Sequence, residues 1–396
     1  MTKRHSRLPD EIANAFDFQA KACRDLASPF TAALCETLAA GLDERSAFGR
    51  RISSWGPRAK ADALALRACG ALHFLARSGK APKLAAVYPP DALDEARLAR
   101  EIARAIEAHD DFLAGFLDRP PQTNETGRSS VILGGALIVA AATGLPLETF
   151  EIGASAGLNL HFDRYAYDLG VGAFGDPSAP LRLACDWRGE APSLDAPLQI
   201  VSHAGCDVDP LDPGEAEHRA RLLAYVWPDQ SERLARMETA LACAAARPER
   251  VERADAGDWL AARLAAPPTR NVARFVYHTV VWQYLPLETK RRATAALEAA
   301  GAATSRETPL ARLQMEADGD TRSAALTLTL WPGGESLALG RADFHGRWAE
   351  WSGVVPHPCG GASLFHTCAR AKLVGASTST EPTRFPLAGA GNGSGT

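Results

Sequence analysis

The sequence lacks the charge pattern of a protein that binds nucleic acid. Its 396 residues carry a formal net charge of −4, with a pI of about 6.2. No basic block and no basic stripe interleaved with aromatic residues occurs in it. Lysine and arginine are scattered along helical patterns, which is typical of solvated helix faces. We therefore expect no nucleic acid partner.

Zinc-binding and membrane-spanning patterns are also missing. None of the eight cysteines forms a Cys-x-x-Cys pair, and none has zinc spacing to a histidine. This usage predicts reduced core thiols and no metal. The N-terminus has no apolar signal core, and the apolar run from Val131 to Ala142 is shorter than the roughly 20 residues that span a bilayer. We expect a soluble cytoplasmic protein without a membrane partner.

Strand patterns are nearly absent from the first part of the chain. Apolar residues recur there at a spacing near 3.6, with charges between them, which predicts an α-helical N-terminal domain over residues 1–147. Proline and glycine mark its breaks. The predicted helices are Asp10–Ala27, Pro29–Gly41, Pro57–Arg77, Asp91–Leu117 and Arg128–Thr143.

From residue 148 to 351 the pattern changes to alternating strands and helices. Such alternation predicts an α/β domain built on a doubly wound, mostly parallel Rossmann-like sheet. The strand candidates are Thr149–Gly153, Gln199–Ala204, Arg250–Ala254, Val272–His278 and Leu310–Glu316. The helix candidates are Asn159–Tyr165, Glu215–Ala245 with a kink or break at Pro228, Asp258–Ala265 and Leu287–Ala299.

The end of this domain differs from its beginning. Two strand patterns around Pro332-Gly-Gly334 predict a terminal antiparallel β-hairpin. An insertion over residues 165–197 reads as a small β excursion. From residue 352 to 396 the chain is rich in Gly, Ser, Thr and Pro and loses periodicity, which predicts a disordered tail.

A glycine-rich stretch after the first strand is the clearest functional signal. Glu151 ends an apolar strand pattern, and Gly153, Ser155 and Gly157 follow at alternate positions before a predicted helix. Small residues let a backbone approach a ligand closely. A dinucleotide is a poor fit, because Ser155 replaces the second glycine and the third small position comes one residue early.

Two other ligand chemistries remain open for this loop. Gly153-Ala-Ser155-Ala-Gly157 matches the nucleophile elbow Gly-x-Ser-x-Gly, and its partners could come from Asp207, Asp255, His278 and His345. The long helical segment before it argues against a hydrolase. The alternative is an S-adenosylmethionine loop, in which an acid at the first strand end precedes alternating small residues.

Acids at the next strand ends favour the nucleoside cofactor. Asp207 could accept hydrogen bonds from both hydroxyls of a ribose, and Asp209 is the second choice for this role. Asp255 could accept from the adenine amino group, with Ala256 donating its N–H. Asp212 and Asp258 read instead as helix N-caps. The predicted cofactor-binding residues are Glu151, Gly153, Ser155, Gly157, Asn159, Asp207, Asp255, Ala256, His278 and Trp282.

The fourth strand end and a polar cluster complete the predicted site. His278 is the candidate base and Tyr284 the second catalytic candidate, while Trp282 and Tyr284 could wall the cofactor or face its sulfonium by cation–π attraction. Alternatively, His278 is a hydrogen-bonded core histidine. The polar cluster before the apolar helix supplies the substrate-binding candidates Gln122, Asn124, Glu125 and Arg128.

Several of these blocks together resemble one bacterial family, domain of unknown function 2332. The matching blocks are Gln122–Glu125, Gly127–Arg128, Phe150–Tyr165, Ala204–Asp212, Tyr225–Gln230, His278–Leu285 and His345–Trp348. The resemblance runs from near the N-terminus to about Trp351. It implies a Rossmann-like, methyltransferase-like fold, and it implies the fold rather than the reaction.

The leading hypothesis is an S-adenosylmethionine-dependent methyltransferase that acts on a small molecule. Methyl transfer requires mainly alignment of the nucleophile with the methyl group, so the absence of a base motif does not oppose it. Two alternatives stay open: a serine esterase that uses Ser155, and a non-catalytic nucleotide-binding or interaction protein.

Overall fold

The computed structural model describes residues 8–90, 92–320 and 322–352. It divides into a helical unit, made of the chain up to Glu125 and the segment Leu211–Pro248, and an α/β unit, made of Thr126–Pro210 and the chain from Glu249. The predicted tail lies outside the described residues, apart from Ser352 at the end of a strand.

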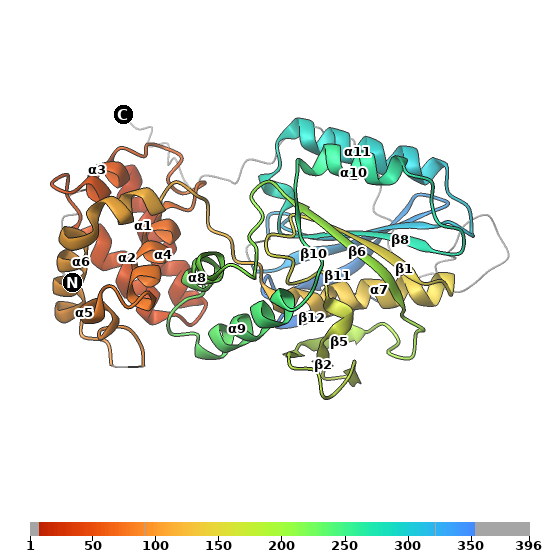
Figure 1. The fold of residues 1–396 in the computed structure, drawn as a ribbon, viewed down its shortest axis with the longest axis horizontal. Helices are drawn as coiled ribbons and strands as arrows, with labels where there is room; N and C mark the ends of the chain where they lie inside the picture. Colours follow the sequence, from red (N-terminus) through yellow and green to blue (C-terminus); the bar gives the residue numbers. More distant parts are fainter. Residues whose placement is uncertain (1–7, 91, 321, 353–396) are drawn as a thin grey trace, which may run out of the picture. The chain divides into compact units, whose positions relative to one another are not determined.

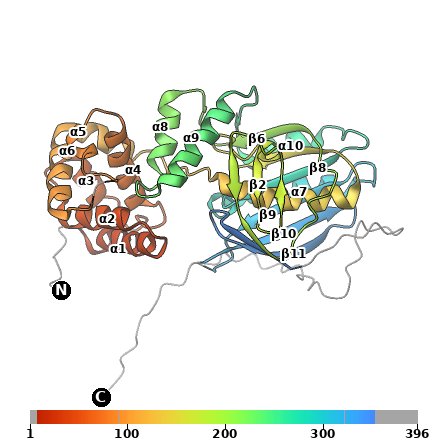
Figure 2. The ribbon, with the colours of Figure 1, turned by 90° about the horizontal axis from the view of Figure 1, so that it is seen from below.

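The helical unit is a bundle around one apolar core, and Figure 2 shows α1 to α6 gathered together. Side-chain caps fix two of the helix starts: Ser46 Oγ accepts from Gly49 N at 2.9 Å, and Asp94 Oδ1 accepts from Arg97 N at 2.9 Å. The helices of this unit are α1 (Asp10–Asp25), α2 (Pro29–Gly41), α3 (Ala47–Ser53), α4 (Leu64–Arg77), α5 (Pro82–Ala85), α6 (Glu95–Phe116), α8 (Ala216–Ala224) and α9 (Ser231–Ala245).

The boundary between the units differs from the expected boundary at residue 147. The all-apolar helix α7 (Ser129–Thr143) belongs to the α/β unit, because it packs on the sheet. A Cβ at Gly134 would lie 2.4 Å from the Trp351 ring, so only glycine permits this close approach. In turn, α8 and α9 join the helical unit: His73 Nδ1 lies 3.1 Å from Ala224 O. As predicted, the helical segment breaks near Pro228.

The α/β unit is built on a mostly parallel sheet of strand order β5-β12-β11-β10-β9-β8-β1-β6-β7. When β1, β6, β7, β8 and β9 are numbered one to five along the chain, these parallel strands stand side by side in the order three, two, one, four, five. The strands of this sheet are β1 (Leu147–Ile152), β5 (Asp186–Glu190), β6 (Ile200–Asp207), β7 (Glu252–Arg253), β8 (Ala273–Thr279), β9 (Leu310–Glu316), β10 (Ala324–Trp331), β11 (Glu335–Ala342) and β12 (Trp348–Ser352).

Helices cover both faces of this sheet. Figure 1 shows α10 (Ala256–Ala265) and α11 (Leu287–Ala302) on one face and α7 on the other. Phe150 and Ile152 of β1 point to the α10 face, where they join Trp259 and Leu260 in an apolar cluster. Because side chains alternate across a strand, Glu151 points to the opposite face.

The antiparallel end of the sheet agrees with the predicted hairpin. β10 and β11 pair in antiparallel register, and β9 spans the predicted residues. The predicted insertion forms a small sheet of β2 (Ala166–Asp168), β3 (Ala173–Phe174) and β4 (Arg182–Ala184). Unexpectedly, β5 of the same insertion pairs with β12 in the main sheet.

One helical stretch among the described residues, Thr126–Thr143, is long and apolar enough to cross a membrane. However, 83% of it is buried inside the protein. The arrangement is that of a core helix and is compatible with a soluble protein.

Candidate functional site

The loop after β1 takes the left-handed backbone conformations that its small residues predict. Gly153, Ser155 and Gly157 have φ angles of +71°, +55° and +74°. The N–H groups of Gly153 and Ala154 both donate to Cys206 O, at 2.9 and 3.0 Å, which fastens the loop to β6. A Cβ on Gly153 would come within 2.4 Å of the Val281 side chain. Glycine is therefore required at 153 by both conformation and space.

The α-helix predicted over Asn159–Tyr165 does not form in this described part of the chain. The loop continues as successive i to i+3 turns and reaches only the short 3-10 helix η2 (Phe162–Arg164). Two carbonyls that an α-helix would use are taken by tyrosine hydroxyls: Tyr165 Oη donates to Leu158 O, and Tyr277 Oη donates to Asn159 O at 3.2 Å. The prediction of an α-helix directly after the loop was therefore wrong.

Glu151 is the buried acid at the end of β1. Its side chain is 2% exposed, and its Oε2 atom has no hydrogen-bond partner among the described residues. Burial, and secondarily the nearby Asp207 carboxylate, raise the pKa of Glu151 from 4.5 to about 8, against the opposing effects of Arg128, Tyr277 and Asn159. This carboxyl is therefore mainly protonated at neutral pH, although an approaching cation would ionise it.

Asp207, at the end of the neighbouring strand β6, holds the loop in place. Its Oδ2 accepts from Ser155 N at 3.0 Å, and its Oδ1 accepts from Asp209 N at 2.9 Å. A carboxylate offers about four lone-pair sites, so each oxygen keeps capacity for a further donor. The structure thus brings Glu151, the small-residue loop and Asp207 together at one edge of the sheet, as the sequence predicts.

Asp255 has the capping role that the sequence pattern assigned to Asp258. It is the N-cap of α10, where its Oδ1 accepts from Gly257 N and Asp258 N at 2.9 and 3.2 Å. Thr289 Oγ1 and Arg292 of α11 also donate to it. Although burial acts to raise the pKa of Asp255, these donors hold it below the usual value. Its predicted partner Ala256 is the first residue of α10.

The two predicted N-caps are wrong. Asp258 lies inside the first turn of α10, because the helix begins two residues before it. Asp212 accepts from Gly214 N at 2.7 Å in a turn, and Glu215 occupies the N-cap position of α8.

His278 is fully enclosed by a hydrogen-bonded network rather than aimed at a substrate. Its Nδ1 lies 2.6 Å from Glu316 Oε1, and its Nε2 accepts from Arg312 at 3.0 Å. Because arginine only donates, Nδ1 carries the proton and neither nitrogen has a lone pair to spare. Burial, the largest influence, lowers the pKa of His278. The geometry matches the alternative of a core histidine and argues against a base.

The two aromatic candidates beside His278, Trp282 and Tyr284, have different surroundings. Trp282 stacks on the imidazole with ring centroids 4.9 Å apart, and the Arg312 guanidinium lies 4.3 Å from the Trp282 ring. Tyr284 is 70% exposed, which does not suit the wall of a pocket. Sequence reasoning missed Arg312 and Glu316, although two charged residues four apart in a largely apolar strand were a usable signal.

The polar cluster at 122–128 spans the boundary between the units. Glu125 is buried in the helical unit, where its carboxylate pairs with Arg233 at 2.6 Å and Arg236 at 3.2 Å. Asn124 is buried, with a φ of +32°, and Gln122 is half-buried. Arg128 belongs to the α/β unit and donates from Nε to Phe344 O at 2.9 Å and from Nη1 to Thr279 O at 3.2 Å.

A histidine pair near the loop was also missed. His161 and His203 meet edge to face with ring centroids 5.4 Å apart, and His203 Nε2 lies 3.4 Å from Asp163 Oδ1. His203 Nδ1 lies 3.2 Å from Thr149 Oγ1. Within the described residues, no group of three or more His, Cys, Asp or Glu side chains is arranged to hold a metal ion.

Comparison with known proteins places the chain in one family. No curated protein matches the sequence. A family model described as "Uncharacterized protein conserved in bacteria (DUF2332)" matches residues 13–351, which include both units, the loop after β1 and the network around His278. The chain therefore belongs to the DUF2332 family.

Proposed function

We propose that the loops at the carboxyl ends of the parallel strands bind S-adenosylmethionine and that the protein transfers its methyl group to a small molecule. The observation that carries this proposal is the buried Glu151 carboxyl, whose Oε2 has no partner within the described part of the chain. A buried polar group without a partner is costly. The ammonium of an amino-acid-bearing cofactor would supply the missing partner.

The strand order supports a ligand at this position. The order three, two, one, four, five is that of doubly wound, Rossmann-like sheets. In such sheets ligands bind outside the carboxyl ends of the strands, where the winding changes direction. That point lies between β1 and β8, and Glu151 pairs in register with Tyr277 of β8 there.

The residues around Glu151 would contact different parts of such a cofactor. The left-handed loop with Gly153 and Ser155 would lie against the amino-acid moiety. Asp207 keeps lone pairs for ribose hydroxyls while it fixes the loop through Ser155 N. His278 takes no direct part, since Glu316 and Arg312 occupy both of its ring nitrogens. Alignment of the reactants, rather than proton transfer, would supply most of the rate enhancement.

Substrate contacts and cellular location are further parts of the proposal. Glu125 is committed to two guanidinium groups within the helical unit, so Arg128, which belongs to the α/β unit, is the candidate substrate residue of its block. The cysteines among the described residues are free thiols, which fits a reducing cytoplasm.

Calorimetric titration tests the proposal. Wild type should bind S-adenosylmethionine and its demethylated product, and Asp207→Ala should weaken both by tenfold or more. Because the pKa of Glu151 is near 8, binding at neutral pH should also release close to one proton, which is measured by comparing buffers of different ionisation enthalpy. Glu151→Gln should release none. Absence of binding by the wild type would end the proposal.

A serine esterase is the second candidate, and one observation favours it. Ser155 has a φ of +55°, and nucleophile elbows hold their serine on a similarly strained turn. The elbow also requires a helix directly after the serine, whereas turns follow Ser155 here, and His278 has both nitrogens occupied. Labelling by a fluorophosphonate that is lost in Ser155→Ala would favour the esterase. Cofactor binding without turnover across substrate panels would favour a non-catalytic protein.

A further inference from the structure

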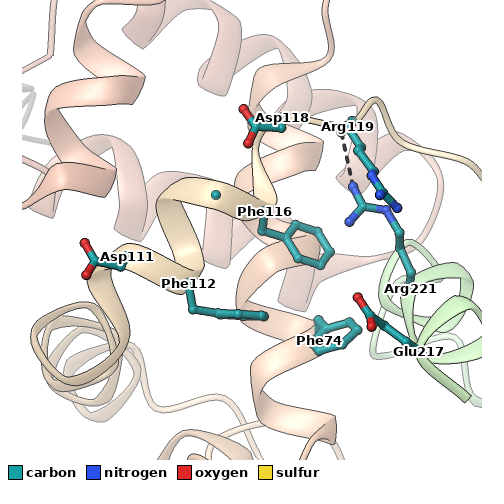
Figure 3. Close-up of a pocket in the computed structure, with 9 residues that line it drawn as sticks. Phe74, Asp111, Phe112, Phe116, Asp118, Arg119, Glu217 and Arg221 are labelled. Carbon is teal, nitrogen blue, oxygen red and sulfur yellow. Dashed lines mark hydrogen bonds between the residues drawn. The ribbon is translucent and has the colours of Figure 1, made fainter.

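A pocket of about 390 Å³ opens in the helical unit, between the end of α6 and the start of α8 (Figure 3). Its volume suits a small molecule rather than a macromolecule. The side chains that give it its chemistry are those of Phe74, Phe112, Phe116, Arg119, Glu217 and Arg221. All these residues belong to one unit, so the pocket does not depend on how the units are arranged.

Three phenyl rings form the apolar part of the pocket. The ring centroids of Phe74, Phe112 and Phe116 lie 5.4 to 6.0 Å from one another. Phe116 is buried, whereas Phe112 is 37% exposed. A partly exposed aromatic cluster of this kind loses water-accessible apolar surface when a further ring packs on it, and offset or edge-to-face ring pairs add to the resulting stabilisation.

Two charged side chains of α8 face the same pocket without an ionic partner. Glu217 and Arg221 are four residues apart, a spacing that usually favours an ion pair. No ion pair joins them, and neither forms one with any other side chain in the described part of the chain. Arg221 lies over the Phe116 ring at 4.5 Å and donates to Arg119 O at 3.5 Å. Figure 3 shows both α8 side chains projecting toward the rings.

Asp111 also lines the pocket, but Figure 3 shows its side chain directed away from the rings. The remaining charges leave one cationic and one anionic point beside the rings. Asp118 is paired with Arg51, and this partner is the main reason that its pKa lies below the usual value. Arg119 and Arg221 both line the pocket, and Arg221 donates to Arg119 O, so the two guanidinium groups can receive one carboxylate. Glu217 is then the acceptor for an ammonium group close to them.

Gly115 keeps the pocket open. It lines the pocket from the last turn of α6, where glycine costs about 0.5–1 kcal/mol relative to alanine, and its backbone does not need glycine, since its φ is not in the left-handed region. A Cβ built on Gly115 meets no atom within 4 Å. Neither packing nor conformation explains this glycine, whereas access to the pocket does.

We propose that this pocket binds a free aromatic amino acid, with its ring on the phenylalanine cluster, its carboxylate on Arg119 and Arg221, and its ammonium on Glu217. The three rings match the aromatic side chain of this ligand class, Arg221 matches its carboxylate, and Glu217 matches its ammonium group. This proposal is independent of the proposed cofactor site, because it rests on different residues and a different ligand.

Titration calorimetry with L-phenylalanine, L-tyrosine and L-tryptophan tests the proposal. A dissociation constant of roughly 10 μM to 1 mM is expected for at least one of them, given mostly exposed charges. Glu217→Gln should weaken binding of the free amino acid by about tenfold but leave binding of its N-acetyl derivative unchanged. Arg221→Gln should likewise weaken the free amino acid but not its amide derivative. In each case the derivative already lacks the charge that the substituted residue would hold.

Gly115→Leu provides the steric test. The leucine should fill the pocket and abolish binding while the helical unit stays folded, since helix propensity improves. Gly41→Leu is the matched control, because Gly41 also ends a helix and has open space around its Cβ, yet lies outside the pocket. No saturable binding by wild type, equal binding of the N-acetyl derivatives and the free amino acids, or unchanged binding by Gly115→Leu would each overturn the proposal.

Discussion

Replacing Glu151 by glutamine tests the buried carboxyl at the end of β1 without any ligand. The side chain is 2% exposed, one of its oxygens has no partner among the described residues, and its pKa is raised from 4.5 to about 8, mainly by burial. Glutamine keeps the size and shape of the side chain but cannot ionise. The variant therefore isolates the free energy associated with the charge.

The sign of the effect follows from proton binding. The folded protein keeps the proton on Glu151 up to a pH of about 8, whereas the unfolded chain releases it near 4.5. Between these values the folded state binds more protons, so the free energy of unfolding falls as the pH rises. The full shift corresponds to about 5 kcal/mol, of which about 3 to 4 kcal/mol is lost between pH values of about 5 and 8.

Urea unfolding of wild type and Glu151→Gln over this pH range measures the effect. The difference between the two proteins cancels the titration of groups that they share, so the variant should gain about 3 to 4 kcal/mol relative to wild type from about pH 5 to pH 8. Glu148→Gln is the control, since Glu148 lies on the same strand with a side chain that is 28% exposed. Parallel curves for wild type and Glu151→Gln would refute the reasoning.

Three further substitutions test other parts of the structure. Asp255→Ala removes the N-cap of α10 and should lower the free energy of unfolding by about 1–2 kcal/mol, yet leave the S-adenosylmethionine affinity from calorimetry unchanged; a tenfold loss of affinity would restore its predicted role as a ligand. Glu125→Gln leaves Arg233 short of its buried partner and should cost about 3–5 kcal/mol in thermal unfolding, and an unchanged Tm would contradict this. Burial lowers the pKa of His278, so the unfolded chain takes up this proton first and the wild type should lose stability as the pH falls below about 6.5. His278→Gln should reduce that loss. The same loss of stability below about pH 6.5 in the two proteins would contradict the network with Glu316.

Elements with strong local signals were predicted well. The strand Leu310–Glu316 and the helix Pro29–Gly41 have the predicted ends, because an alternating pattern and a proline at the first helical position are local properties. The helix predicted from Pro57 begins only at Leu64. Asp62 holds the preceding turn by accepting from Trp55 Nε1 and from Arg58, and such a turn is set by side-chain contacts rather than by periodicity.

The choice among the candidate acids could not be made from the sequence. Glu151, Asp207 and Asp255 all follow strand patterns, and each was a reasonable ligand. In the structure Asp255 is occupied by donors from α11, 34 and 37 residues later in the chain. Glu151 has one oxygen without a partner among the residues that the structure describes. Which carboxylate stays available depends on helices that arrive from distant parts of the chain.

The sequence by itself determined the alternation of strands and helices, the small-residue loop after Glu151, and the acid at the end of the next strand, because these rest on spacing between near neighbours. Only the tertiary structure decided that α7 belongs with the sheet, that Glu316 and Arg312 enclose His278, and that the loop continues as turns. Burial and long-range hydrogen bonds set these features. They therefore appear only when the chain is folded.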